Sequence, residues 1–153
     1  MSPYVATVVW TRPADAPFKD NKYSRAHEWR FDGGAVVKGS SAPSSVRVPL
    51  SDPTAVDPEE ALVAALSSCH MLFFLSYAAQ AGLVIDRYED EAVGEMGKNA
   101  NGKTAIVKVT LRPKITWVGA AATAEQLDEL HHKSHDHCYI ANSISAQVVI
   151  ESR

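Results

Sequence analysis

Two cysteines, Cys69 and Cys138, are the residues of this chain best suited to chemistry, and each has a histidine directly beside it. The thiolate form of cysteine is the nucleophile, and a nearby imidazolium lowers the pKa of a thiol. The neighbouring His70 and His137 therefore favour thiolate chemistry. The structural alternatives are a small hydrophobic residue packed in a core for Cys69 and a cysteine at the end of a solvated helix for Cys138.

The same region also allows a metal site. His131 and His135 stand four residues apart on one face of a predicted helix, and Cys138 follows about one turn later. Histidine and cysteine are good zinc ligands, but this spacing matches no usual closed zinc site and the chain has no C-x-x-C pair. A hydrated polar helix face explains these residues equally. A Ser-His-Asp triad stays open as an alternative, although no G-x-S-x-G elbow supports one.

Composition limits the classes of protein to consider. The 153 residues are 46% hydrophobic and 22% charged, which is ordinary for a globular protein. This length suits one domain, so we expect residues 1–153 to form a single domain. The 15 Lys and Arg residues against 18 Asp and Glu residues give a net charge of −3, which argues against a nucleic-acid partner.

We expect no targeting segment in this sequence. The first ten residues have no basic region, and their apolar stretch is too short for a signal peptide. The apolar segment Ala61–Ala79 approaches the length of a membrane span, but serine and histidine side chains interrupt it. We expect a buried core helix there, no membrane partner and a cytoplasmic location, where thiols are kept reduced.

The first third of the chain has the alternation typical of β-strands. Side chains at every second position from Tyr23 to Phe31, Arg25 among them, share one face of a predicted strand. The Asp32-Gly33-Gly34 sequence is a turn signal. Acidic side chains further along are interpreted as the exposed side of another strand: Glu89, Asp90, Glu91 and Glu95. The predicted strands of the first third are Tyr4–Thr11, Tyr23–Phe31, Ala35–Lys38 and Val46–Leu50.

A long helix follows. Asp57 suits the N-cap, Pro58 the first helical position and Glu60 the N3 position. Apolar residues then lie on every side of the predicted helix, which is typical of a helix buried all round. Gly82 is a plausible stop, so we expect about 24 residues, or about 36 Å.

The second half predicts more strands and one further helix. Thr123 to Gln126 fits a capping box and opens a helix that runs toward Cys138. Strands, a long helix, strands, a helix and a strand make an α+β fold. The predicted strands are Ile85–Met96 and Thr104–Leu111 as a hairpin around residues 99–102, then Pro113–Val118 and the closing strand Ile144–Ile150.

Three motifs, in order, resemble those of the OsmC/Ohr family of osmotically inducible and organic-hydroperoxide-resistance proteins. They are Asp57-Pro58-Glu59-Glu60, the cysteine ten residues after Glu59, and Ser134-His135-x-x-Cys138. The β pattern around these motifs agrees as well, so the resemblance covers most of the chain. It implies an OsmC-like α+β fold, with antiparallel sheets wrapped around a long central helix in an intertwined homodimer.

The resemblance also implies a thiol-dependent peroxidase without a cofactor or metal. Cys69 matches the peroxidatic cysteine and Cys138 the resolving one, and Glu59 matches a glutamate that partners an arginine beside the thiolate. Three arginines are candidates for that partner: Arg25, Arg30 and Arg47. We favour Arg25, because it shares a predicted strand face with Tyr23 and Trp29. The sequence departs from the family at His70, where many members carry Phe, and at Tyr139, where Pro is common.

Helix geometry gives an independent expectation. Glu59 and Cys69 are ten residues apart, or about 15 Å along a straight helix, so they cannot touch within one continuous helix. Either the helix breaks or Glu59 reaches the Cys69 of a second subunit, and we expect the homodimer. The apolar residues after Cys69 favour organic hydroperoxides over hydrogen peroxide.

The expected turnover also needs an external dithiol, which a lipoyl protein, thioredoxin or a small thiol could supply. Three other functions stay open at this point. They are a non-catalytic small-molecule-binding dimer, a redox sensor of the same fold, and the His/Cys metal-binding protein described above.

Overall fold

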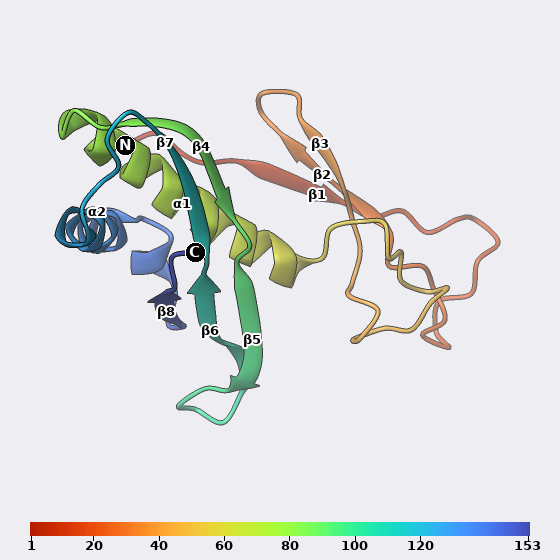
Figure 1. Ribbon diagram of the computed structural model, residues 1–153. Helices are drawn as coiled ribbons and strands as arrows, with labels where there is room; N and C mark the ends of the chain where they lie inside the picture. The colour runs from red at the N-terminus through yellow and green to blue at the C-terminus, as the bar shows by residue number, and fades with distance from the viewer. The chain divides into compact units, whose positions relative to one another are not determined.

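The computed structural model describes all residues 1–153, which form two compact units, Met1–Ala61 and Leu62–Arg153 (Figure 1). The first unit holds three strands and the first residues of the long helix. The second unit holds the rest of that helix, five strands, a second helix and a 3-10 turn. In chain order the elements are β1 (Ala6–Val9), β2 (His27–Phe31), β3 (Val36–Gly39), α1 (Pro58–Gln80), β4 (Val84–Asp90), β5 (Val93–Lys98), β6 (Thr104–Leu111), β7 (Pro113–Val118), α2 (Ala124–His137), η1 (Ala141–Ser143) and β8 (Gln147–Ile150).

The first unit contains one antiparallel sheet in the order β1-β2-β3. Trp29 is its central position, opposite Val8 on one side and Val37 on the other. Strands β2 and β3 pair antiparallel across the turn predicted at Asp32-Gly33-Gly34. Strand β2 begins only at His27, so the predicted strand from Tyr23 is too long at its start.

The predicted strand Val46–Leu50 is wrong. These residues form turns, in which the backbone N–H of Leu50 donates to the carbonyl of Arg47 over 3.0 Å. The carbonyl of Leu50 in turn accepts from the N–H of Arg25 at 2.7 Å. Pro49 offers no N–H to a sheet, so the segment satisfies its backbone locally instead of pairing with a strand.

Helix α1 begins and ends where the sequence predicts, and its 23 residues run without a break. The Asp57 carboxylate accepts from the N–H of Glu60 at 2.8 Å, and the Glu60 carboxylate accepts from the N–H of Asp57 at 3.2 Å. This reciprocal pair satisfies two backbone donors at the helix start. At the other end Gly82 adopts φ 75°, a left-handed conformation that glycine takes at no steric cost.

Burial of α1 differs from the expectation. The buried side chains form one stripe at four-residue spacing: Leu66, His70, Phe74 and Ala78. Leu72, on another side of the helix, is exposed. One copy of the chain therefore covers one face of α1, and the prediction of a helix buried on all sides is wrong for a single chain. Although α1 has the length and hydropathy of a membrane span, this stripe packs into the second unit as a core helix does.

The second unit contains two small sheets that lie beside α1 and α2 (Figure 1). Strands β5 and β6 form the predicted antiparallel hairpin, β8 pairs with β6 in parallel, and β4 pairs with β7. The single strand predicted over Ile85–Met96 is wrong, because it is split into β4 and β5 after Asp90. The Asp90 carboxylate accepts the N–H of Arg112 at 2.6 Å, which ties the break to the start of β7.

Helix α2 starts with the predicted capping box. The Thr123 hydroxyl accepts from the N–H of Gln126 at 3.2 Å, and the Gln126 amide oxygen accepts from the N–H of Thr123 at 2.9 Å. The second unit has two buried clusters, one around Leu66 and Leu111 and the other around Phe74 and Leu130. Two helices and several mainly antiparallel sheets confirm the α+β class.

Candidate functional site

The two cysteines lie together in the second unit although 68 residues separate them in sequence. Cys69 lies in the middle of α1, and Cys138 is the C-cap residue of α2. Both are free thiols and both belong to the hydrophobic cluster around Leu66 and Leu111. Cys138 is 0% exposed, whereas Cys69 is partly exposed. Of the two thiols, Cys69 is therefore the one that a molecule from solvent can reach.

Burial controls the ionisation of Cys138. Loss of hydration and the neighbouring Cys69 thiol together raise the pKa of Cys138 to about 11. The N–H of Ala141 donates to its sulfur over 3.3 Å and works in the opposite direction. Cys138 is therefore a protonated thiol at neutral pH, held beside the more accessible Cys69.

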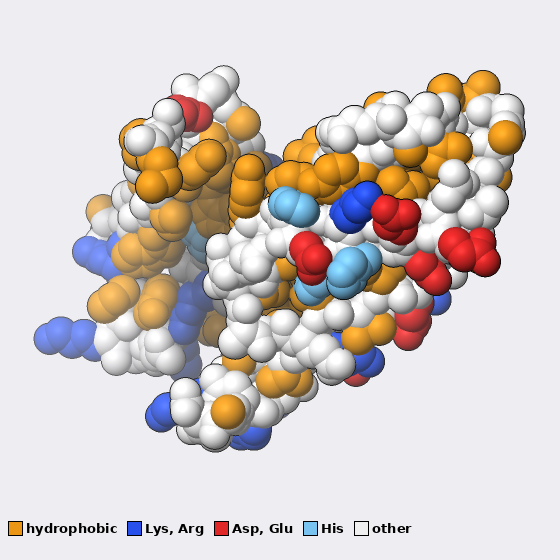
Figure 2. All heavy atoms as spheres, turned by 90° about the vertical axis from the view of Figure 1, so that its left-hand side faces the viewer, with side chains coloured by type: hydrophobic (Ala, Val, Ile, Leu, Met, Phe, Trp, Pro, Cys, Tyr) orange, Lys and Arg blue, Asp and Glu red, His pale blue; other side chains and the backbone are white.

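Aromatic side chains border this thiol pair. Phe73 packs against the cysteine cluster, and its ring meets the ring of Tyr139 edge-on with 5.3 Å between centroids. The ring of His137 lies 6.3 Å from that of Phe73, and its Nδ1 donates to the carbonyl of Lys133. Figure 2 shows histidine, acidic and basic side chains gathered on the side of the molecule where α2 is drawn. The immediate neighbours of the two thiols are thus apolar and aromatic side chains.

Arg25 lies in a separate cavity of about 420 Å³ within the first unit. The wall of this cavity is largely aromatic: the rings of Trp10, Phe18 and Tyr23 pack on one another with centroids 4.7 to 5.8 Å apart. The Ser41 hydroxyl is buried without a hydrogen-bond partner. The cavity is lined by Val8, Trp10, Phe18, Tyr23, Arg25, His27, Ser40, Ser41 and Pro58.

The guanidinium of Arg25 is held in place by its own loop. It donates to the backbone carbonyl and the side-chain oxygen of Asn21 at 3.1 and 3.0 Å, and lies 3.7 Å from the centre of the Tyr23 ring. The other two arginines differ. Arg30 forms an exposed ion pair with Glu28 at 2.8 Å, while the exposed side chain of Arg47 makes no hydrogen bond or ion pair. Of the three candidate arginines, Arg25 lines the aromatic cavity of the first unit.

Glu59 is half-buried in the first turn of α1 and makes no ion pair. Because α1 is continuous, Glu59 and Cys69 are about 15 Å apart along its axis. Arg25 likewise forms no ion pair with Glu59 in this single chain. The structure brings together the two predicted cysteines, and it leaves the predicted glutamate and arginine unpaired.

A buried histidine pair was missed by the sequence analysis. His70 Nε2 and His131 Nδ1 are 3.0 Å apart, and the two side chains are 1% and 5% exposed. Burial lowers the pKa of both histidines to about 4. Their only signal in the sequence is the place of His70 at four-residue spacing in the apolar stripe of α1.

The hydrogen bonds of His131 bear on the predicted metal site, because they occupy both of its ring nitrogens. His131 uses one ring nitrogen on His70 and the other on the Ser152 hydroxyl, 3.0 Å away. No three His, Cys, Asp or Glu side chains are grouped so that they could hold a metal ion. The proposed ligand set of His131, His135 and Cys138 is therefore not assembled.

Asp90 was also misread as simply exposed. Its carboxylate is half-buried and accepts hydrogen bonds from the Ser67 hydroxyl of α1 and the N–H of Arg112. The Tyr88 hydroxyl nearby is buried without a partner. Burial and the Asp90 charge raise the pKa of Tyr88 above its ordinary value, so the phenol stays neutral.

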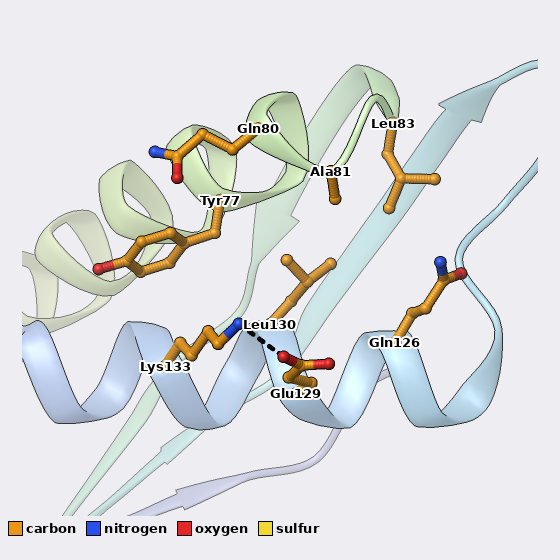
Figure 3. Close-up of a pocket in the computed structure, with 8 residues that line it drawn as sticks. All are labelled: Tyr77, Gln80, Ala81, Leu83, Gln126, Glu129, Leu130 and Lys133. Carbon is orange, nitrogen blue, oxygen red and sulfur yellow. Dashed lines mark ion pairs between the residues drawn. The ribbon is translucent and has the colours of Figure 1, made fainter.

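A smaller cavity of about 270 Å³ lies between the end of α1 and α2 (Figure 3). Tyr77 and Gln80 face it from α1, and the Lys133–Glu129 ion pair faces it from α2. That ion pair is exposed at the surface. The cavity holds no cysteine or histidine, so it adds nothing to the thiol chemistry.

Comparison with known proteins agrees with this architecture. Residues 51–153 match the family model described as OsmC-like protein, while no curated protein matches the chain. An OsmC-like protein of unknown function from Vibrio cholerae is 51% identical, with 100% of both chains covered and a TM-score of 0.97.

More distant solved structures share the fold. The organic hydroperoxide resistance protein of Elizabethkingia anophelis is 16% identical over 99% of this chain and 94% of that one, with a TM-score of 0.70. The corresponding protein OhrB of Bacillus subtilis is 20% identical over 98% of both chains, with a TM-score of 0.67. On the match of its last two thirds and the close full-length relative, this chain belongs to the OsmC-like family.

Proposed function

We propose that this protein is a thiol-dependent peroxidase that reduces organic hydroperoxides, with Cys69 as the peroxidatic and Cys138 as the resolving cysteine. The observation that carries the proposal is the asymmetry of the thiol pair. Cys69 is partly exposed and can meet a peroxide, while Cys138 is fully buried and protonated beside it. Such a division of roles is what a two-cysteine peroxidase needs.

The proposed peroxidase reaction has three steps. The Cys69 thiolate attacks one oxygen of the hydroperoxide, the O–O bond breaks, and Cys69 becomes a sulfenic acid. The departing alkoxide takes from solvent the proton that Cys69 released on ionising and leaves as an alcohol. The Cys138 sulfur then bonds to the Cys69 sulfur, and the sulfenic oxygen leaves with the Cys138 proton as water. An external dithiol reduces the disulfide by two exchange reactions and is itself oxidised to a disulfide.

The surroundings of the pair support an organic substrate. Leu66, Val109 and Leu111 are buried beside Cys138, and Phe73 packs on the same cluster. Burying each CH₂ group of an alkyl hydroperoxide is worth about 0.8 kcal/mol, which hydrogen peroxide cannot gain. A preference for alkyl or aryl hydroperoxides follows.

The proposal includes a second copy of the chain. One copy leaves some apolar side chains of helix α1 uncovered: Ala64 and Ala65 are exposed, and Leu72 is 61% exposed. Glu59 cannot reach the Cys69 of its own α1, and Arg25 has no carboxylate partner. We therefore infer a homodimer in which Arg25 and Glu59 of one copy support the Cys69 thiolate of the other, the guanidinium stabilising the anion.

Steady consumption of cumene hydroperoxide with dithiothreitol tests the proposal. Wild type should turn over many times, Cys69→Ser should not react above background, and Cys138→Ser should consume about one equivalent and then stop without disulfide recycling. Hydrogen peroxide at the same concentration should react more slowly.

Ser145→Ala, at an exposed position after the 3-10 turn, is the matched control and should keep activity. Mass spectrometry after one equivalent of peroxide should find the 69–138 disulfide. Equal peroxide consumption by wild type and Cys69→Ser would contradict the enzymatic proposal and favour a non-catalytic binding protein.

A further inference from the structure

A serine, a buried histidine and a second buried histidine form a hydrogen-bonded chain in the second unit, and the peroxidase chemistry uses none of them. The Ser152 hydroxyl is 3.0 Å from His131 Nε2, and His131 Nδ1 is 3.0 Å from His70 Nε2. A nucleophile bonded to a base that is oriented by a third group is the arrangement of serine hydrolases. Ser152 follows β8 and is not part of a G-x-S-x-G elbow.

The serine end of this hydrogen-bonded series is exposed to solvent, and the histidine end is buried. Ser152 is exposed, whereas His131 and His70 are almost fully buried. Phe74 covers His131, with 4.5 Å between ring centroids, so the imidazole has little room to turn away from the serine. A reagent in solution can therefore meet the hydroxyl while the base behind it stays dry and fixed.

The backbone holds Ser152 on both sides. The N–H of Glu151 donates to the carbonyl of Leu111 at 2.8 Å, and the N–H of Arg153 donates to the carbonyl of Pro113 at 2.9 Å. The N–H of Ser152 itself makes no hydrogen bond, and β8 is the edge strand of its sheet. That free donor, on the nucleophile's own residue, is one of the donors that serine proteases use for the oxyanion.

We propose that Ser152, His131 and His70 form a serine-nucleophile site, separate from the thiol pair, that accepts an acyl or phosphonyl group from an activated ester or fluoride. With a fluorophosphonate, the Ser152 oxygen bonds to phosphorus, the P–F bond breaks, fluoride leaves and the serine proton passes to His131 Nε2. His70 accepts the hydrogen bond of His131 Nδ1–H and so keeps Nε2 free as the base.

The charges around the pair fit this role. Asp90 of β4 and Asp128 of α2 both act on His131 and favour its protonated form, whereas burial opposes it. His135 of α2 acts on His70. Because the pKa of His131 is about 4, its Nε2 is unprotonated throughout pH 5–8. The reactivity of Ser152 should hence be flat over that range, whereas an unassisted hydroxyl becomes more reactive with every unit of pH.

Labelling of full-length protein with an alkyl fluorophosphonate tests the site, in a Cys69→Ser/Cys138→Ser background that removes both thiols. Peptide mapping should place one adduct on Ser152, at a rate about 100-fold or more above that of the exposed Ser145, since a positioned base contributes at least that much. Ser152→Ala should abolish the adduct, and Ser145→Ala should leave it unchanged.

His70 variants separate a positioning role from a merely structural one. Gln at position 70 keeps an oxygen that can accept from His131, whereas Phe does not, so His70→Gln should retain most of the labelling rate and His70→Phe should lose it. Thermal melting of each variant checks that it is folded. Labelling at the same rate on Ser145 and Ser152, or a rate that rises steadily from pH 5 to 8, would overturn the proposal without touching the peroxidase assignment.

Discussion

Lowering the pH from 7 to 5 should destabilise the protein through the buried pair of His70 and His131. Both side chains are almost fully buried, and burial lowers the pKa of each from 6.5 to about 4. The unfolded chain takes up protons below pH 6.5, while the folded chain does not until about pH 4. The stability is therefore fully present above pH 6.5 and is lost progressively as the pH falls toward 4.

The size of the effect follows from those two values. Between pH 7 and pH 5 the unfolded histidine gains most of a proton and the folded one gains almost none, so linkage gives about 2 kcal/mol for each histidine. The pair together loses about 4 kcal/mol, against a usual total stability of about 5–15 kcal/mol. A positive charge on His131 also opposes protonation of His70, so the two rings do not both gain a proton until the pH is well below 6.5.

Urea denaturation followed by tryptophan fluorescence measures this loss, since one of the three tryptophans, Trp117, has its ring 6.5 Å from that of Phe74 in the same cluster. A His70→Leu/His131→Leu variant replaces both polar partners with apolar side chains. Between pH 7 and pH 5 its free energy of unfolding should fall by about 4 kcal/mol less than that of wild type. His132→Gln, an exposed histidine, should behave as wild type. Parallel loss of stability in wild type and the double variant would refute the reasoning.

Two further predictions concern the thiols and the arginines. Iodoacetamide at pH 7 should modify Cys69 within minutes and Cys138 only after unfolding, because Cys138 is fully buried and its pKa is about 11. Peptide mapping over time measures this order, and alkylation of Cys138 before Cys69 would contradict the roles proposed for the two cysteines. Arg25→Ala should lower kcat/KM for cumene hydroperoxide at least about tenfold, since it removes the cation that we propose supports the Cys69 thiolate of the other copy. Arg30→Ala should change it little, because that guanidinium is already paired with Glu28 at the surface.

Sequence reasoning succeeded wherever local chemistry marks the end of an element. The reciprocal caps at Asp57 and Thr123 and the left-handed Gly82 fix both helices, and each can be recognised from residues within one turn. Predictions from the sequence were wrong where the local structure depends on hydrogen-bond partners that are far away in the sequence. The segment Val46–Leu50 reads as a strand until its backbone bonds are known, and Asp90 ends β4 because of partners on α1 and after β6.

In the candidate site, too, some residues could be found from local sequence and others only from tertiary packing. The cysteines were identified from their residue type and spacing, and folding places them together as expected. The pairing of His70 with His131 joins residues 61 positions apart, and no local pattern indicates which of six histidines will meet. Four-residue spacing with Leu66 and Phe74 could have placed His70 in the core, but its partner required the packing of α2 on α1.

The inferred dimer predicts that two defective variants can restore activity when they form mixed dimers. If Arg25 of one copy serves Cys69 of the other, then Arg25→Ala chains, which keep at most about a tenth of wild-type activity, and Cys69→Ser chains, which are inactive, should regain activity when refolded together. A mixed dimer has one intact pair, the Cys69 of the first chain with the Arg25 of the second. With random pairing half the dimers are mixed, each with one of two sites intact, so about a quarter of wild-type activity should return.

Mixing Cys69→Ser with Cys138→Ser chains is the control for that experiment. Both thiols of one site come from the same chain, because Cys69 and Cys138 share one cluster in the second unit. No mixed dimer of these two variants contains an intact thiol pair, so recycling activity should stay absent. Recovery in this control but not in the arginine mixture would mean that the thiols meet across copies and that Arg25 acts within its own chain, which reverses the inferred division of the site.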